Sequence, residues 1–559
     1  MNGLLRVAAA TVRPRSPSGR GYALPAFAVL LIALFFSRLG HRDLYSSHEA
    51  RAAQNAQRML DTGEWAIPTL FDGQIDLQKP PGYYWLVAAA GWLNGGTVTE
   101  FETRLPAALA GLITVLMVFA FLRSEGRPTA AWIAAGALAT AIHFTGISRT
   151  ARIDVPLTCA ITAGLLLLYR RSWLAALPIT AGILLKGPIA VALIGPVALY
   201  LFLGSHKPTD RRRSALPVAL ILGVAFALPW FVWADHVTQG EFYRVFIVHH
   251  HVERFAGTSP ALASHPWWYY IPRFAIDFLP WTPAFVLLAV WLYRTRGDRP
   301  ATNTSPPALR GRGRRADASS ISTAGEQALE RLPETPPHPE SNPLHAASTP
   351  TSPPQSQGRG EDLSPIVRRD PHLRFGMVWF VAMFVLLSTA HFKRADYLLP
   401  LYPGAAIAFG CAAEAWLASR LPRTGRIARL ALQAMLGLTL VGWQVMSFVV
   451  EPREQAKEEK RRFAAMIREL APPPNEVLLF RTEPHLLAWH LGRPIASRVE
   501  WHDLRAFCDP PGTHFVVMPP EYVSFAQHIV TERKLVEVSR LEEYTADKPP
   551  RPLVLLRTE

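Results

Sequence analysis

Long unbroken runs of apolar residues constrain this chain more than any other feature. The segments LPAALAGLITVLMVFAFL (105–122) and LPVALILGVAFALPWFVWA (216–234) carry no charged side chain. A run of about 18 or more apolar residues matches the length of helix that crosses the hydrocarbon core of a bilayer. A soluble protein would instead spread its apolar residues at helix or strand periods. The sequence therefore predicts a multi-spanning α-helical membrane protein.

The hydropathy pattern predicts eleven spans. They lie near residues 23–39, 105–122, 129–147, 154–170, 173–185, 187–204, 215–234, 274–293, 375–390, 398–418 and 430–450. The apolar stretch GYYWLVAAAGWLNG (82–95) is too short to cross a bilayer. Because it is rich in Tyr and Trp, we expect a helix at the membrane interface there.

The formal net charge of +15 supports this count. If the N-terminus is cytoplasmic, every loop predicted to be inside carries Lys or Arg, which is the positive-inside pattern. The basic composition therefore needs no nucleic-acid partner, although it suits contact with anionic membrane lipids. An odd number of spans places the C-terminus outside. We expect a multi-pass protein of the cell (inner or plasma) membrane, with its C-terminal domain extracytoplasmic.

Composition divides the chain into five parts. The insertion is dense in Pro, Ser, Thr, Gly and Arg, so it cannot bury enough apolar surface to fold. The C-terminal part alternates apolar strands, expected at 476–481, 514–519 and 552–557, with helix-like stretches. The parts are a basic cytoplasmic N-terminus (1–22), a first membrane part (23–297) with external loops 40–104 and 235–273, a disordered cytoplasmic insertion (298–371), a second membrane part (372–450) and an external α/β domain (451–559).

The first external loop offers two ionisable candidates. Ser46 and Ser47 precede Glu49 as in a capping box, so Glu49 is either a helix cap or an acid or base that faces a site. Lys79 precedes two prolines in QKPPGYYW. Its ammonium group could neutralise a phosphate, or it could snorkel to lipid head groups. The sequence leaves both pairs of alternatives open.

Further candidates stand at the predicted span ends. Asp154 begins a span in ARIDVPL, and Lys186 lies between two apolar blocks, where a charge usually marks function. Lys393 and Tyr397 stand four residues apart in FKRADYLLPLYP. Each has a structural alternative, an ion pair or a polar turn. Their gathering at one predicted face is the stronger evidence for a site.

These segments, in order, resemble the polyprenyl-phosphate-dependent membrane glycosyltransferases of the C-type fold. The most similar branches are the lipid A aminoarabinose transferases and the protein O-mannosyltransferases. The matching strings cover about residues 40–410. They are HEARAAQNAQRMLDTGEW, QKPPGYYWL, RLPAALAGL, ARIDVPL, LLKGP, HHVERFAG, HPWWYY with LPWTP, and FKRADYLLPLYP.

The resemblance implies roles for individual residues. The family's first loop usually shows Asp-Glu followed by Arg, and His48, Glu49 and Arg51 stand there in this chain. Asp154 matches the family's second acidic position, so Asp154 and Glu49 are the candidate catalytic residues. The positions expected to hold the donor phosphate or its sugar are Lys79, Arg51, Lys186, His251, Arg254, Lys393 and Tyr397.

The implied reaction moves a hexose or pentose from a polyprenyl phosphate to a hydroxyl of a lipid, glycan or protein at the outer face. A carboxylate takes or orients the hydroxyl proton, and cations stabilise the charge that grows on the phosphate. No nucleotide leaves, so no metal or other cofactor is required. His249, His250 and His251 do not share one helix face, which argues against a zinc site.

A transporter or flippase of lipid-linked sugars is the alternative function. Transporters usually carry internal repeats and place charges near the bilayer midplane. This chain shows no repeat, and most of its charges lie at span ends. The sugar, the acceptor, the stereochemical outcome and the oligomeric state cannot be read from the sequence.

Overall fold

The computed structural model of the protein describes residues 23–204, 214–257, 264–295, 370–420, 422–455, 460–473, 476–482, 484–544 and 551–559. The basic N-terminus (1–22) and nearly all of the predicted insertion (298–371) lie outside the described residues.

Apolar helices make up most of the described chain, which confirms the multi-spanning helical fold. Five of the described segments are long and apolar enough to cross a membrane, or seven if each bent pair counts as one span. The five are α5 (Glu100–Ser124), α11 (Ala215–Val237), α16 (Pro371–Thr389), η5 with α17 (Ala395–Leu401, Tyr402–Ala418), and α18 continuing through η6 and α19 (Pro422–Val445, Met446–Val450, Glu451–Gln455).

The remaining predicted spans fall on bent or shorter helices. The bent pairs are α6 with α7 (Pro128–Thr140, Ile142–Ser148) and η4–α13 with α14 (Trp267–Tyr269, Tyr270–Asp277, Thr282–Arg294). The shorter apolar helices are α2 (Ala23–Phe36), α8 (Asp154–Tyr169), η1 with α9 (Trp173–Ala175, Ala176–Lys186) and α10 (Ile189–Leu203).

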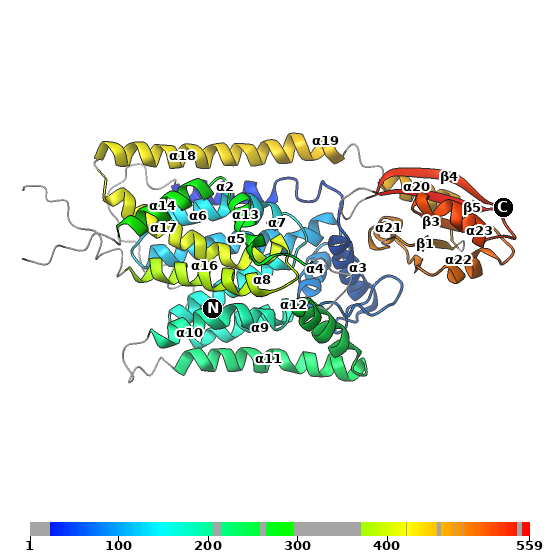
Figure 1. Cartoon of the computed structure of the whole chain (residues 1–559), viewed down its shortest axis with the longest axis horizontal. Coiled ribbons are helices and arrows are strands. Elements are labelled where there is room, and N and C mark those ends of the chain that lie inside the picture. Colours follow the sequence, from blue (N-terminus) through cyan, green and yellow to red (C-terminus); the bar gives the residue numbers. More distant parts are fainter. Residues whose placement is uncertain are drawn as a thin grey trace, which may run out of the picture.

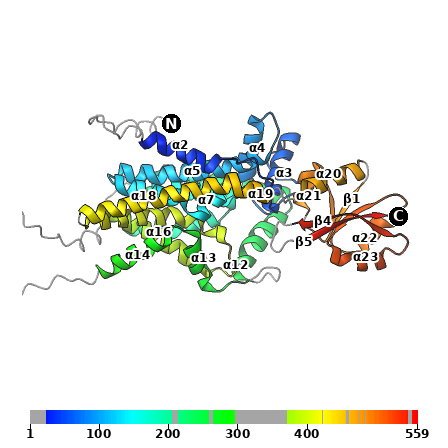
Figure 2. The same ribbon diagram turned by 90° about the horizontal axis from the view of Figure 1, so that it is seen from above.

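These helices form one elongated bundle with a separate α/β domain at one end (Figure 1). A second view shows α18 lying along the bundle and α19 pointing toward that domain (Figure 2). The last helix thus runs past residue 450, where the composition changes. Lipid tails are as apolar as the helices, so close packing rather than hydrophobic burial holds the bundle together. At Gly410 of α17, for example, a methyl group would lie 2.5 Å from the carbonyl oxygen of Ala130.

The two bent spans touch each other at their bends. The bend is 63° between α6 and α7 and 113° between α13 and α14. The backbone N–H of Ile142 donates to the carbonyl of Leu279 at 3.0 Å. The indole N–H of Trp281 donates to the Thr140 hydroxyl at 2.8 Å. Polar groups at each bend therefore form hydrogen bonds with groups at the other bend.

Two short helices outside the candidate spans position the site. In α3 (Ser47–Thr62) the Ser46 hydroxyl accepts from the Glu49 N–H, and Gly63 ends the helix in a left-handed conformation. Both ends agree with the sequence signals. Next along the chain is α4 (Gly82–Leu93), the expected short apolar helix. The π-helix η3 (Tyr243–Glu253) and α12 (Arg254–Ala256) follow α11.

The C-terminal domain is a mixed five-stranded sheet of order β2-β1-β3-β5-β4. The three predicted strands are confirmed as β1 (Val477–Phe480), β3 (Phe515–Met518) and β5 (Arg551–Thr558). Sequence reasoning missed the short β2 (Ala496–Arg498) and the charge-rich β4 (Leu535–Tyr544), neither of which has an apolar run. The helices are α20 (Lys460–Leu470), α21 (His485–Leu491), α22 (Trp501–Cys508), η7 (Pro520–Tyr522) and α23 (Val523–Ile529).

This domain rests on α3. The Gln54 amide donates to the carbonyl of His485 at 2.7 Å. The rings of Phe71 and Trp489 stack with their centroids 6.1 Å apart. The docking places the start of α21 beside α3.

Candidate functional site

Three residues from distant segments meet where α8 begins and α9 ends. The Lys186 ammonium group pairs with the Asp154 carboxylate. The same ammonium lies 4.3 Å from the centre of the Tyr397 ring. Asp154 is buried. The structure therefore brings together a carboxylate, a cation and a phenol that the sequence had placed about 30 and 240 residues apart.

His251 joins this group with Lys79. Its Nδ1 donates to the carbonyl of Phe246 at 2.7 Å, since a carbonyl can only accept. Burial lowers the pKa of His251, and the positive charges of Lys79 and Lys186 lower it further. Both ammonium groups thus act on one imidazole ring and disfavour its protonated form.

A second imidazole, that of His48, faces four cations. Burial is the largest cause that lowers the pKa of His48 well below its usual value, and Arg152, Arg394, Arg51 and Lys79 lower it further. His48 as a whole residue still keeps solvent-accessible surface. Because a guanidinium group has no acceptor, Arg394 donates to His48 Nε2, at 3.2 Å. His48 therefore satisfies a hydrogen bond of Arg394 without cancelling its charge.

Asp396 forms ion pairs with two of these cations. Its Oδ2 lies 3.7 Å from Arg152 and 3.5 Å from Arg394. The sequence reasoning did not assign Arg152, Arg394, Asp396 or His48 to the site. The sequence did offer one signal for these four residues. Each stands beside a residue that was assigned to the site, in ARIDVPL, KRADYL or HEAR.

Arg51 and Lys393 are held by other groups. Arg51 pairs with the buried Asp76, which also accepts from Asn55 at 3.0 Å and from the Tyr84 hydroxyl at 3.2 Å. The ammonium group of Lys393 donates to backbone carbonyls of the loops that flank it, including that of His265 at 3.1 Å. The side chain of Arg254 lies outside the described residues.

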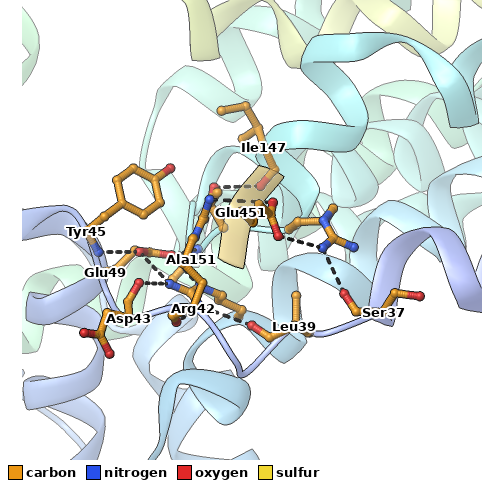
Figure 3. A network of polar contacts seen from close by, with 12 residues as sticks. Ser37, Leu39, Arg42, Asp43, Tyr45, Glu49, Ile147, Ala151 and Glu451 are labelled. Atoms are coloured by element: carbon orange, nitrogen blue, oxygen red, sulfur yellow. Dashed lines mark hydrogen bonds and ion pairs between the residues drawn. The ribbon is translucent and has the colours of Figure 1, made fainter. Parts of the chain in front are cut away.

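Glu49 occupies a different environment from Asp154. It is fully buried, and its two oxygens accept from Arg104 at 2.9 and 3.1 Å. The backbone N–H groups of Ala151 and Tyr45 also donate to it, at 2.9 and 3.2 Å (Figure 3). Despite the desolvation of the carboxyl group, Arg104 holds the pKa of Glu49 at about 2. A permanently ionised, fully bonded carboxylate is poorly suited to accept a proton from a substrate.

The same network of hydrogen bonds and ion pairs holds together the chain segments around Glu49. Arg104 also donates to the carbonyls of Leu39 and Asp43, at 3.1 and 2.7 Å. Glu451 of α19 lies 3.8 Å from Arg42 and 3.5 Å from Arg149 (Figure 3). This network, the Glu49 clasp, joins α5, the first loop and the last helix.

An aromatic cavity of about 520 Å³ lies beside the site, between the first loop, α4 and α11. The indole N–H groups of Trp85 and Trp230 donate to the carbonyls of Trp65 and Ala66, at 2.6 and 2.9 Å. These bonds fix the loop against both helices. Among the described residues, no three His, Cys, Asp or Glu side chains form a group that could hold a metal ion. That the site works without a metal stays a prediction.

Comparison with known proteins relates the membrane part to a family of sugar transferases. Residues 22–232 match the family model described as dolichyl-phosphate-mannose-protein mannosyltransferase. The undecaprenyl phosphate-alpha-4-amino-4-deoxy-L-arabinose arabinosyl transferase of Pectobacterium carotovorum subsp. carotovorum (strain PC1) is 30% identical over 271 residues, 45% of this chain and 47% of that protein. The transferase of the same name from Pseudomonas aeruginosa (strain PAO1) is 30% identical over 271 residues, 46% and 48% of the two chains.

The fold comparison covers more of the chain. The crystal structure of ArnT from Cupriavidus metallidurans bound to undecaprenyl phosphate covers 96% of this chain and 98% of its own, with a TM-score of 0.66 and 17% identity. The predicted resemblance to C-type membrane glycosyltransferases is therefore confirmed, and the fold is shared. In sequence the chain spans about half the length of the curated relatives it matches.

Proposed function

We propose that the protein is a membrane glycosyltransferase that moves a sugar from a polyprenyl-phosphate donor to an acceptor hydroxyl at the outer face of the membrane. The observation that carries the proposal is the cluster of cations and one carboxylate at one end of the bundle. Lys79, Lys186, Arg152 and Arg394 lower the pKa of His48 or His251 there, next to Asp154. Relatives and the shared fold support the same reaction class.

The cations suit the donor phosphate. A lipid-linked sugar phosphate carries one negative charge, and a second develops as the glycosidic bond breaks. Lys79 and Lys186 act on His251 together, so both lie where they stabilise such a charge. The desolvated surroundings strengthen this attraction, because the effective dielectric constant is lower than in bulk water. Arg152 and Arg394 extend the positive region toward His48.

Asp154 suits the acceptor side of the reaction better than Glu49. The acceptor oxygen bonds to the anomeric carbon as the phosphate leaves with the bonding electron pair. The hydroxyl proton passes to a base, and Asp154 stands at the mouth of α8 beside Lys186. When Lys186 turns toward the bound phosphate, Asp154 gains a free oxygen to accept that proton. Glu49 has no such freedom, because Arg104 and two backbone amides occupy its oxygens.

The proposed orientation places this end of the bundle outside. Lys and Arg recur at the opposite end, where Arg127 pairs with Asp370 at 2.7 Å and also pairs with Glu414. By the positive-inside rule that end is cytoplasmic. The proposal includes lipids, glycans and proteins as acceptor classes and does not choose among them.

The central test is sugar transfer by purified protein in liposomes that contain a polyprenyl-phosphate sugar. We expect Asp154→Asn and Lys79→Ala each to lower transfer by about 10²-fold or more, since each removes a charge that acts in the transition state. Asp61→Asn, on the outward surface of α3, is the matched control and should keep wild-type activity. Full transfer by both site variants would overturn the proposed mechanism.

A second arm separates transfer from transport. The glycosyltransferase releases a sugar-free polyprenyl phosphate and a glycosylated acceptor, both visible by mass spectrometry. A flippase moves the intact donor between leaflets without either product. Mass spectrometry of envelope lipids, glycans and proteins from a deletion strain should then show one lost glycosyl mass, which identifies the acceptor class.

A further inference from the structure

A row of buried ionisable side chains lies behind the cationic cluster, between the two bent spans. His143 stands just after the bend between α6 and α7, and Asp277 ends α13 before the second bend. Nδ1 of His143 lies 3.6 Å from Asp277, and its Nε2 lies 3.6 Å from Asp396. All three residues are buried. Ionisable groups at membrane depth are costly and usually functional.

The row ends in arginines on both sides. Arg273 donates to Asp277 at 2.8 Å. At the other end Oδ1 of Asp396 faces His143, while its Oδ2 faces both Arg152 and Arg394. The charges thus alternate in sign from Arg273 to the cationic cluster when His143 carries a proton on each nitrogen.

The ring can hold Asp396 through a single proton on Nε2. The Tyr402 hydroxyl lies 3.1 Å from Nδ1 and can hydrogen-bond to that nitrogen. Asp277 has Arg273 as a second partner, so the contact between His143 and Asp396 does not depend on a charge on the ring.

We propose that His143 is a positioning residue of the donor-phosphate site. It holds the inner oxygen of Asp396, so that the outer oxygen keeps Arg152 and Arg394 side by side as an anion clamp. The assignment of a phosphate to this clamp rests on the proposed function. The positioning of the two guanidinium groups rests on the distances alone.

A purely structural role would make a different prediction. If the row only joins the two bent spans, loss of the His143 imidazole should lower stability but leave the phosphate affinity of the folded protein unchanged. The chain contains a matched control for this distinction. His372 also lies between two carboxylates, 3.3 Å from Glu125 and 3.7 Å from Asp370, but at the opposite end of α16 from the cluster.

The test measures binding of undecaprenyl phosphate to the full-length protein in lipid nanodiscs. We expect His143→Gln to weaken binding by at least 10-fold when affinity is expressed per folded protein. His372→Gln should change the affinity less than 2-fold, because it removes the same kind of side chain far from the clamp. Wild-type affinity in His143→Gln, equal losses in both variants, or no binding by the wild-type protein would overturn the proposal.

A second readout needs no ligand. Nitrogen NMR of histidine-labelled protein identifies His143 as the signal that His143→Gln removes. We expect its Nε2 to carry a proton that is held by Asp396, and the signal of that nitrogen to move in Asp396→Asn. An Nε2 without a proton in the wild-type protein would contradict the proposal. If undecaprenyl phosphate binds as expected but no sugar is transferred, the glycosyltransferase function fails while the clamp stands.

Discussion

At the scale of single residues, two carboxylates at the same end of the bundle have opposite environments. Glu49 is fully buried with four hydrogen bonds, whereas Asp154 stands at a helix mouth with one ammonium partner. A carboxylate with saturated oxygens holds neighbouring segments together. One with a single mobile partner can exchange that partner for a substrate. Burial and bonding, rather than residue type, decide between structure and chemistry.

The clasp around Glu49 should therefore be a major source of stability. We expect Arg104→Met to destabilise the protein by about 3–5 kcal/mol, because it leaves a buried carboxylate without its cation. Thermal unfolding in detergent measures this as a large fall in Tm. Glu64→Gln, which removes an exposed carboxylate of the same loop, should change stability by less than about 0.5 kcal/mol. Equal Tm values for Arg104→Met and the wild-type protein would refute the clasp.

The pH dependence of stability is a second test of the pair of Glu49 and Arg104. The pKa of Glu49 is lowered from 4.5 to about 2 in the folded protein. Its contribution to stability is therefore fully present above pH 4.5 and is lost as the pH falls toward 2. The wild-type Tm should drop through this window, and the drop should be smaller in Arg104→Met.

At the scale of elements, the site depends on how closely α4 approaches α9. A Cβ at Gly82, the first residue of α4, would lie 2.6 Å from the carbonyl oxygen of Leu184. Leu184 is two residues from Lys186, and Gly82 is three residues from Lys79. The contact between the two backbones thus sets the spacing of the two ammonium groups.

Gly82→Ala should consequently lower sugar transfer more than stability. The added methyl meets rigid backbone, so α4 must move away from α9 and carry Lys79 with it. Gly91→Ala on the same helix is the control, since its methyl would meet the side chains of Val98 and Leu60 instead, at 2.7 and 2.9 Å. We expect at least a 10-fold loss of transfer for Gly82→Ala and a clearly smaller one for Gly91→Ala. Similar activity losses in the two variants would contradict this account.

At the scale of the whole molecule, the two ends of the bundle differ in charge and in what they carry. One end holds the cationic cluster, α3, α4 and the docked C-terminal domain (Figure 1). The other holds the Arg127 ion pairs. Under the proposed function, the lipid donor and the acceptor would meet at the end that carries the C-terminal domain.

Single-cysteine labelling can verify the proposed orientation. Thr62→Cys, at the exposed end of α3, should react with a membrane-impermeant maleimide in intact cells. Ser419→Cys, after α17, should react only once the cells are broken. The native cysteines Cys411 and Cys508 are buried and should contribute little background. The reverse pattern would invert the topology.

Apolar run length and charge asymmetry were enough to predict the helical membrane fold. Water is absent from the bilayer core, so the backbone there must satisfy its own hydrogen bonds, and few structures remain. The ends of α3 and three strands of the sheet also followed from local signals, namely Ser46, Gly63 and short apolar runs. The breaks within two spans could not be predicted from local signals. The polar groups at each break form hydrogen bonds with the other break rather than with their own neighbours in sequence.

The sequence by itself determined which residue types gather at one end of the bundle, since span boundaries place Lys79, Asp154, Lys186 and Tyr397 there. Only the tertiary structure decided which of them face one another. Glu49 and Asp154 look alike in the sequence, and the difference lies in Arg104, which approaches Glu49 from α5. Asp396, Arg152 and His143 become a unit only when three segments pack together. Ion pairs form only across distances of a few ångströms, and the packing of the helices and loops sets those distances.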